Sequence, residues 1–328
     1  RRTVTYSRNV TLSLSRTCVS HCKYCAFQTH QAHLHSPDEV VRLMDRSAAR
    51  GIKELLILTG DVPDHHEGVR ERLEQLGHRD FVSYVAWCCE QALERGLLPH
   101  TNIGAVSRPD LVRLREVTAS QGLMLESIRD DLVVHQGSPT KDPALRMQTI
   151  RDAGELKIPF TSGILVGIGE RPDERVAALE ALAGLHAEHG HLQEVILQNV
   201  VPHRRYYGEE PAEIATEAAE RFWRTGLREE NASVDVPAWA NPVTLEELRE
   251  LVAVARELFG DEVGIQVPPN LSEFWPELVA AGATDLGGLS ANGDHISPEH
   301  PFPSPKQVAD RLAQDGVAVR ERLCAYRC

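Results

Sequence analysis

The sequence predicts a single α/β domain, a (β/α)8 barrel of the TIM type that is either closed or partly open. Short β-rich runs alternate with longer amphipathic stretches along almost all of the 328 residues. Eight such units of about 41 residues each leave room for the right-handed crossovers that join parallel strands. No Pro-, Ser- or Gly-rich linker divides the chain. We therefore expect one barrel and not a doubly wound sheet.

The expected strands and helices follow one another in regular alternation. Strands are expected at residues 10–14, 54–58, 98–103, 123–126, 160–165, 194–198, 264–267 and 285–289. Helices are expected at residues 36–50, 70–95, 109–120, 142–153, 173–189, 245–259 and 272–281. Two helix starts carry explicit signals, because Ser36 precedes a proline and two acidic residues, and Thr244 begins a Thr-x-x-Glu capping box.

Three regions make up the expected domain of residues 1–328. Residues 1–9 form an N-terminal arm, residues 10–289 form the barrel, and residues 290–328 form a cap of loops and a helix. An acidic insertion at about residues 208–236 follows the sixth strand and contains a predicted helix at residues 211–224.

The net charge and the arrangement of the cysteines argue against several classes of protein. With 48 acidic and 35 basic residues the net charge is −13, which argues against nucleic-acid binding because a phosphate backbone would be repelled. No stretch approaches the ~18–20 apolar residues of a membrane helix. Seven cysteines, clustered and odd in number, are unlike a secreted disulfide framework, and no apolar signal segment follows Arg1. We expect a cytoplasmic protein with neither a nucleic-acid nor a membrane partner.

The strongest motif is a C-x3-C-x2-C run formed by Cys18, Cys22 and Cys25 directly after the first predicted strand. Thiolates suit iron–sulfur clusters and zinc. Three thiolates can hold three irons of a cubic cluster and leave the fourth iron open for catalysis. A structural zinc site or three buried thiols are the alternatives, although no second pair of zinc ligands follows. The candidates for a fourth zinc ligand are His21, His30, His33 and His35.

Further polar residues lie at the ends of predicted strands, where barrel active sites assemble. Gly60 and Asp61 follow residues 54–58, and Glu126 ends residues 123–126. Gly163 and Gly167 belong to a strand that runs into a glycine-rich turn, whose spacing does not fit a dinucleotide-binding fingerprint.

The cysteine motif, with aromatic Tyr24 just before the third cysteine, resembles the signature of the radical S-adenosylmethionine (SAM) enzymes. The resemblance implies a [4Fe–4S] cluster held by Cys18, Cys22 and Cys25, with the amino and carboxylate groups of SAM on the open iron. One-electron reduction in that family cleaves SAM to methionine and a 5′-deoxyadenosyl radical. Tyr24 is then expected near the adenine.

The same resemblance gives expected roles to the residues at the strand ends. Gly60 and Asp61 resemble a Gly-Gly-Glu motif that accepts hydrogen bonds from the SAM ammonium group, with Asp in place of Glu and one glycine lost. Glu126 is expected to bind a hydroxyl or ammonium group, and Arg146 in the next helix to neutralise the SAM carboxylate. Residues 163–170, which include Gly163 and Gly167, are similar to a segment that lines the adenine, with Leu165 at an isoleucine position.

A narrower resemblance extends over residues 4–323. The segments 5–10, 22–27, 59–63, 124–127, 266–271, 285–290 and 294–299 resemble the deazaflavin-forming enzymes, and in particular the cyclising subunit of the 7,8-didemethyl-8-hydroxy-5-deazariboflavin (FO) synthases. This resemblance implies a lyase that consumes SAM and abstracts hydrogen from 5-amino-5-(4-hydroxybenzyl)-6-(D-ribitylimino)-5,6-dihydrouracil. Ring closure, ammonia loss and oxidation follow. It also implies a one-electron reductant and a partner radical SAM subunit that makes this ribityluracil adduct.

Such a substrate needs amides, carboxylates and hydroxyls around it. The candidates at strand ends and in the cap are Gln198, Asn199, Gln266, Asn270, Asp294 and His295. His295 is also a candidate for proton transfer, since the pKa of histidine lies near working pH. Aromatic contacts to the hydroxybenzyl ring are expected from Tyr206, Tyr207, Phe274 or Trp275.

Other interpretations stay open at this stage. The chain could be the hydroxybenzyl-transferring partner subunit, a menaquinone-pathway relative, or a non-catalytic zinc or iron–sulfur protein. Cys88 and Cys89 are interpreted as small buried hydrophobic residues, and Cys324 and Cys328 have no expected role. The sequence does not define the hydrogen abstracted, the electron donor, the oligomeric state, or whether the chain stands alone or is part of a fused synthase.

Overall fold

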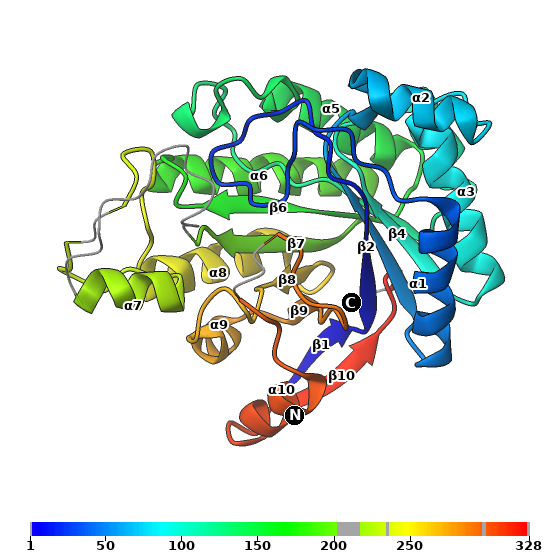
Figure 1. The fold of residues 1–328 in the computed structure, drawn as a ribbon. Coiled ribbons are helices and arrows are strands. Elements are labelled where there is room, and N and C mark those ends of the chain that lie inside the picture. The colour runs from blue at the N-terminus through cyan, green and yellow to red at the C-terminus, as the bar shows by residue number, and fades with distance from the viewer. Residues whose placement is uncertain (1, 202–216, 234–235, 297–299, 327–328) are drawn as a thin grey trace.

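The computed structural model describes residues 2–201, 217–233, 236–296 and 300–326, which form one curled parallel sheet with helices outside it (Figure 1). The sheet order is β10-β1-β9-β8-β7-β6-β5-β4-β3-β2. Strands β2 to β9 therefore neighbour one another in chain order, which confirms the (β/α)8 type. The strands are β1 (Thr3–Ser7), β2 (Asn9–Ser15), β3 (Glu54–Thr59), β4 (Leu98–Asn102), β5 (Ser120–Gly122), β6 (Phe160–Val166), β7 (Leu192–Asn199), β8 (Gly264–Gln266), β9 (Asp285–Gly288) and β10 (Ala318–Arg322).

Helices cover the outer face of the sheet because their apolar stripes pack on outward-pointing strand residues. Two apolar clusters fill this layer, one around β6 and β7 and one around β2 and β3. The helices are α1 (Pro37–Ala49), α2 (Glu67–Gln75), α3 (Phe81–Glu94), α4 (Arg108–Arg115), α5 (Pro143–Glu155), α6 (Pro172–His189), α7 (Glu217–Thr225), α8 (Leu245–Phe259), α9 (Trp275–Ala281) and α10 (Pro305–Ala313). Short 3-10 turns are η1 (Pro63–His65), η2 (Val133–His135) and η3 (Pro139–Lys141).

The barrel is closed by a loop and not by a complete ladder between its first and last strands. Strands β1 and β2 are separated only by Arg8. β1 pairs with β9 and β10, whereas β2 pairs with β3. Beyond β9, the backbone N–H groups of Leu289 and Ala291 donate to the carbonyl oxygens of Ser7 and Asn9, each at 2.9 Å. The segment after β9 thus runs beside β2 and completes the wall.

Two sequence-based element boundaries were wrong. The single helix expected at residues 70–95 is two helices, because Gly77 adopts a φ of 80° after α2 and Asp80 caps the start of α3. The strand expected at residues 123–126 begins earlier as β5, whose ladder to β6 ends at Gly122. Glu126 then rejoins β6 through an isolated bridge to Ile164.

The expected arm and cap both contribute strands to the sheet. The arm contains β1, and the cap contains α10 and β10, which lie beside each other at one end of the barrel near the N-terminus (Figure 1). Residues 202–216, which include the first part of the expected insertion, lie outside the described residues, and α7 covers the end of the helix expected at residues 211–224. None of the helices formed by the described residues is long and apolar enough to cross a membrane.

Candidate active site

The three cysteines of the motif lie on the loop between β2 and α1, above the end of β3. The Cys18 N–H donates to the Thr29 carbonyl at 3.1 Å, and the Lys23 N–H donates to the Val134 carbonyl at 3.0 Å. Gly60 makes this arrangement possible, because a Cβ at its position would lie 2.2 Å from the Thr17 carbonyl oxygen and 2.7 Å from the Cys18 Cβ. A glycine is therefore required where β3 ends.

All three thiols face one cavity of about 150 Å³. Cys18 Sγ accepts backbone N–H groups of Ser20 at 3.4 Å and Asp61 at 3.2 Å. Cys22 Sγ lies 3.4 Å from the Ser138 hydroxyl oxygen. Burial raises the pKa of the Cys18 thiol, with the Asp61 charge as the next cause, and burial raises the pKa of Cys25 to about 11. Metal binding would therefore release protons from these thiols.

The donor set fits an iron–sulfur cluster better than a single ion. Within the part of the chain that the structure describes, no three His, Cys, Asp or Glu side chains converge closely enough to hold one metal ion. A cluster binds each thiolate to a different iron, so its ligands are spaced farther apart than those of zinc. The two N–H groups at Cys18 Sγ also suit a thiolate ligand.

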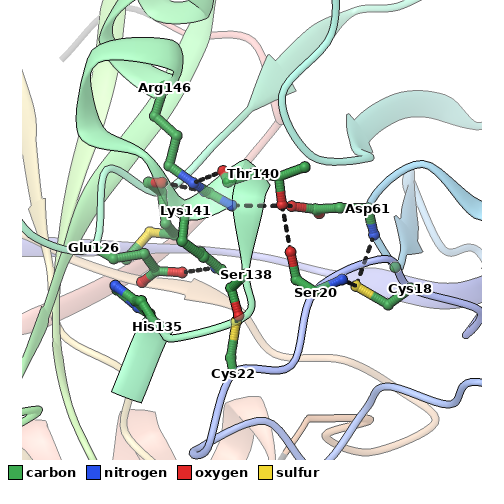
Figure 2. Close-up of polar contacts among 12 residues, drawn as sticks. Cys18, Ser20, Cys22, Asp61, Glu126, His135, Ser138, Thr140, Lys141 and Arg146 are labelled. Carbon is green, nitrogen blue, oxygen red and sulfur yellow. Dashed lines mark hydrogen bonds and ion pairs between the residues drawn. The ribbon is translucent and has the colours of Figure 1, made fainter. Parts of the chain in front are cut away.

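Asp61 is fixed by a buried network that reaches from β3 to α5 (Figure 2). Arg146, 2% exposed, donates to the Thr140 carbonyl at 2.9 Å, to the Met124 carbonyl at 2.5 Å and to Asp61 Oδ2 at 3.2 Å. The Thr140 hydroxyl donates to the same carboxylate. Arg146 therefore positions Asp61 and the chain around it, and its guanidinium is already occupied by protein acceptors.

Glu126 lies at the centre of a second polar group in the same cavity (Figure 2). Its carboxylate accepts from Lys141 Nζ at 2.7 Å and from the Tyr24 hydroxyl at 3.3 Å. The Tyr24 hydroxyl also lies 3.1 Å from His135 Nε2. Glu126 has a φ of 66°, which is rare for a residue with a side chain, so the backbone turns here where the carboxylate enters the cavity.

Burial and neighbouring charges determine which side chains of this second polar group are ionised. Burial opposes ionisation of Glu126, but the charges of Lys141 and Arg146 outweigh it and lower the pKa of the carboxyl to about 2. Burial, followed by the Lys141 charge, lowers the pKa of His135 to about 3. Burial and then the Glu126 charge raise the pKa of Tyr24 well above its usual value. At neutral pH the cavity thus holds a carboxylate, an ammonium group and a phenol, and the neutral imidazole of His135 lies beside that phenol.

A close backbone contact and a left-handed backbone conformation explain the two glycines that were expected beside SAM. Gly163 lies in β6 where a Cβ would be 2.3 Å from the Ile196 carbonyl oxygen of β7. Gly167, with a φ of 98°, donates its N–H to Glu170 Oε1 at 2.7 Å. Neither glycine lines the cavity with the cysteines, whereas Leu165 between them does.

The expected substrate residues gather around a second cavity of about 190 Å³, with the exception of Asn199. This substrate cavity is lined by Gln198, Gln266, Asn270, Asp294 and His295. Asn199 lines the first cavity, but it is 2% exposed and its amide donates to the carbonyls of Gly226 at 2.9 Å and Leu271 at 3.0 Å. Asn199 thus joins the segments that contain Gly226 and Leu271 by hydrogen bonds.

His295 and Asn270 present polar atoms at this cavity. His295 Nδ1 hydrogen-bonds with the Ser13 hydroxyl, and burial lowers the pKa of the ring. The imidazole is therefore neutral at pH 7. The Asn270 amide nitrogen donates to Asp294 Oδ2 at 2.7 Å, while its Oδ1 is buried and has no partner in the part of the chain that the structure describes. Of the expected aromatic residues, Tyr206 and Tyr207 lie outside the described residues, and Phe274 and Trp275 do not line the substrate cavity.

The sequence analysis did not identify three residues that shape the site. Lys141 and Ser138 lie in turns without a hydrophobic period, and their position before α5 is the one sequence signal that points to them. Gly104 leaves room for Asp61, because a Cβ there would lie 2.4 Å from its Oδ1.

The cysteines outside the motif that the structure describes lie away from the cysteine cavity. Cys88 and Cys89 are buried in α3, as expected. Cys324 is buried at the opposite end of the barrel, and Cys328 lies outside the described residues.

Comparisons with known proteins agree with this geometry. Residues 12–182 match the model of the radical SAM superfamily. The 7,8-didemethyl-8-hydroxy-5-deazariboflavin synthase of Methanoculleus marisnigri is 40% identical over 99% of this chain and 89% of its own length. The synthase of Archaeoglobus fulgidus of the same name is 39% identical over 98% of this chain and 90% of its own.

Solved structures show the same fold at low sequence identity. The FeFe-hydrogenase maturase HydG of Carboxydothermus hydrogenoformans has a TM-score of 0.69 and 19% identity, covering 99% of this chain and 69% of that one. Methylornithine synthase has a TM-score of 0.64 and 16% identity, covering 97% and 84%. Taken with the cysteine loop and its cavity, these findings place the chain in the 7,8-didemethyl-8-hydroxy-5-deazariboflavin synthase family of the radical SAM superfamily, whose enzymes use a [4Fe–4S] cluster and SAM.

Proposed function

We propose that this chain is the cyclising subunit of deazaflavin synthesis, a lyase that acts on 5-amino-5-(4-hydroxybenzyl)-6-(D-ribitylimino)-5,6-dihydrouracil. One adduct and one SAM give one deazaflavin, 5′-deoxyadenosine, methionine and ammonium. A partner radical SAM subunit supplies the adduct, and an external one-electron donor starts the reaction. The support comes from the family and from the two adjoining cavities.

The observation that carries the proposal is that the cysteine cavity adjoins the substrate cavity. Both are lined by the same six residues, Leu58, Asn102, Met124, Gln198, Leu271 and Ile296. A molecule in the substrate cavity would therefore lie beside the cavity that holds the thiols and Asp61. Hydrogen abstraction needs the two reactants to lie close together.

On the cofactor side, Cys18, Cys22 and Cys25 would hold the cluster, which with SAM supplies a 5′-deoxyadenosyl radical when both are bound. Asp61 and Glu126 offer carboxylate oxygens to an ammonium group in the cavity. Lys141 is the cation suited to a carboxylate, because Arg146 is occupied by protein acceptors whereas Lys141 Nζ has one hydrogen-bond acceptor, Glu126, in the described structure. A single acceptor leaves two of the three ammonium protons to donate.

On the substrate side, the amides and hydroxyls suit a neutral, polyhydroxylated ligand. Gln198, Gln266 and Asn270 supply amide groups, and Asn270 Oδ1 has no donor among the described residues. We propose that His295, neutral and fixed through its Nδ1 to Ser13, accepts or returns the proton that moves when ammonia leaves. Its Nε2 is the atom that would carry this proton.

The proposal is tested by offering the reduced, cluster-loaded enzyme two substrate sets. With the isolated adduct and SAM we expect deazaflavin fluorescence and 5′-deoxyadenosine, and with tyrosine, ribityldiaminouracil and SAM we expect no adduct. The reverse result would show the hydroxybenzyl-transferring subunit instead. Cys22→Ala should abolish 5′-deoxyadenosine formation, whereas the buried helix variant Cys89→Ala, which lines neither cavity, should retain it.

A further inference from the structure

A third cavity lies below the substrate cavity, inside the barrel and toward its opposite end. This floor chamber has a volume of about 120 Å³, several times the ~10–15 Å³ that one water requires. It adjoins the substrate cavity, since both are lined by Asn9, Asn102, Met124 and Gln266. The three cavities therefore follow one another through the barrel from the cysteine loop toward β10.

The chamber is built from polar side chains that point inward from successive strands. Its polar lining includes Ser7, Asn9, His100, Asn102, Thr161 and Gln266. Asn9 is 3% exposed, and its Oδ1 has no hydrogen-bond partner in the described structure. A buried carbonyl oxygen without a donor costs free energy unless a ligand or water supplies one. This atom therefore indicates a ligand that donates hydrogen bonds.

His100 is a neutral group at the same level. Its Nδ1 hydrogen-bonds with the Ser120 hydroxyl at 2.6 Å, and burial lowers the pKa of the ring to about 4. Its Nε2 lies on the side of Gly122, where a Cβ would come within 2.9 Å. Gly122 thus keeps space open beside a ring nitrogen that can exchange hydrogen bonds with a hydroxyl group.

The chamber offers no free positive charge. Among its lining residues, Arg322 is the one arginine or lysine, and it is bound to Asp285 at 2.7 and 2.8 Å and to Glu194 at 2.7 Å. Glu54 adds a third buried carboxyl group and accepts the Ser7 hydroxyl. Three carboxyl groups thus face one guanidinium, and burial raises the pKa values of two of them, Glu54 and Glu194. The chamber therefore has no free cation with which an anionic ligand such as a phosphate could pair.

From this chemistry we infer that the floor chamber binds the polyol chain of the substrate and excludes a phosphate at the end of that chain. The inference rests on the proposed function, which supplies a substrate with a ribityl chain. Hydroxyl groups donate to Asn9 Oδ1 and exchange hydrogen bonds with His100 Nε2. The ring system then stays above, in the substrate cavity and beside the cysteine loop.

The test combines a chamber variant with a shortened substrate. Thr161 lines the floor chamber and neither of the other two cavities, so Thr161→Leu narrows only the chamber. We expect its kcat/KM for the ribityl adduct to fall by about tenfold or more, as expected for one or two lost hydrogen bonds. For the adduct with a 2-hydroxyethyl chain, the change should stay within about threefold, because that chain leaves the chamber empty.

Comparison of two substrates within one variant separates the chamber from a general folding defect, which would affect both equally. Thr101→Val, on β4 with its hydroxyl buried and outside all three cavities, is the control and should leave both values unchanged. Equal losses for both adducts in Thr161→Leu would overturn the inference and show a chamber that holds only solvent.

The terminal group is tested on the wild-type enzyme. An adduct phosphorylated at the end of the ribityl chain should have a kcat/KM about tenfold or more below that of the free alcohol. Equal use of the two would refute the exclusion of phosphate. If the wild type forms no deazaflavin from the ribityl adduct at all, the proposed function fails first, and the inference fails with it.

Discussion

Replacement of Lys141 by methionine tests the electrostatic arrangement of the cysteine cavity. Lys141 and Glu126 form a 2.7 Å ion pair whose side chains are 12% and 10% exposed. Lys141→Met keeps much of the side-chain volume and removes the charge. Glu126 then stays buried with its nearest counter-charge gone, which is the situation in which a broken ion pair destabilises most.

The expected size of the effect follows from the carboxyl group. A pKa of about 2 in the folded protein against the usual 4.5 corresponds to about 3 kcal/mol of stabilisation of the folded state. Because the folded pKa is the lower one, this contribution is complete above pH ~4.5 and is lost as pH falls toward 2. Lys141→Met, which leaves the smaller contribution of Arg146 in place, should therefore lower the free energy of unfolding at pH 7 by up to about 3 kcal/mol and flatten its dependence on pH between 5 and 2.

Urea unfolding of the metal-free protein, followed by tryptophan fluorescence, measures this difference. The double variant Lys141→Met/Glu126→Gln should recover most of the loss, because no buried charge is then left unpaired. Lys306→Met is the control, since its ion pair with Asp310 is on the surface, 83% and 64% exposed, and should contribute little. A loss below about 1 kcal/mol, or a double variant no better than the single one, would refute the reasoning.

Two other substitutions have definite expected results. Gly60→Ala places a methyl group 2.2 Å from a backbone carbonyl and against Cys18, so cluster content after reconstitution, read from visible absorption and iron analysis, should fall to a small fraction of wild type; Gly184→Ala, with nothing within 4 Å of its Cβ position, should match wild type. Arg322→Met leaves Asp285 and its neighbouring carboxyl groups buried without a counter-charge, so the free energy of unfolding should fall by about 3–5 kcal/mol, and an unchanged urea midpoint would contradict this.

The strand order and the grouping of the three motif cysteines were predictable because their signals are local. Several strand–helix units have an apolar pattern and a helix cap of their own, as at Ser36 and Thr244, and the parallel order follows from right-handed crossovers. The three cysteines lie within eight residues, so one loop brings them together. All of the expected substrate residues except Asn199 also lie around one cavity, in part because the ends of parallel strands share one edge of the sheet.

Partners distant in sequence could not be predicted. Arg146 was expected to face SAM, but its binding to Asp61 depends on how α5 packs beside β3, 85 residues away. Lys141 follows a run of turns with no period to place it. Arg322 lies in the charged strand β10, which resembles an exposed edge in sequence, yet its side chain crosses to Asp285 and Glu194 beneath the barrel. Such contacts depend on tertiary packing and leave no local pattern.

The central claim is that one site cleaves SAM and closes the deazaflavin ring. The most direct measurement follows 5′-deoxyadenosine and deazaflavin together by liquid chromatography and mass spectrometry, after the reduced, cluster-loaded protein is mixed with SAM and the isolated adduct. We predict that both products accumulate in a ratio near one to one and that neither exceeds background in Cys22→Ala. Formation of 5′-deoxyadenosine without deazaflavin would contradict the claim.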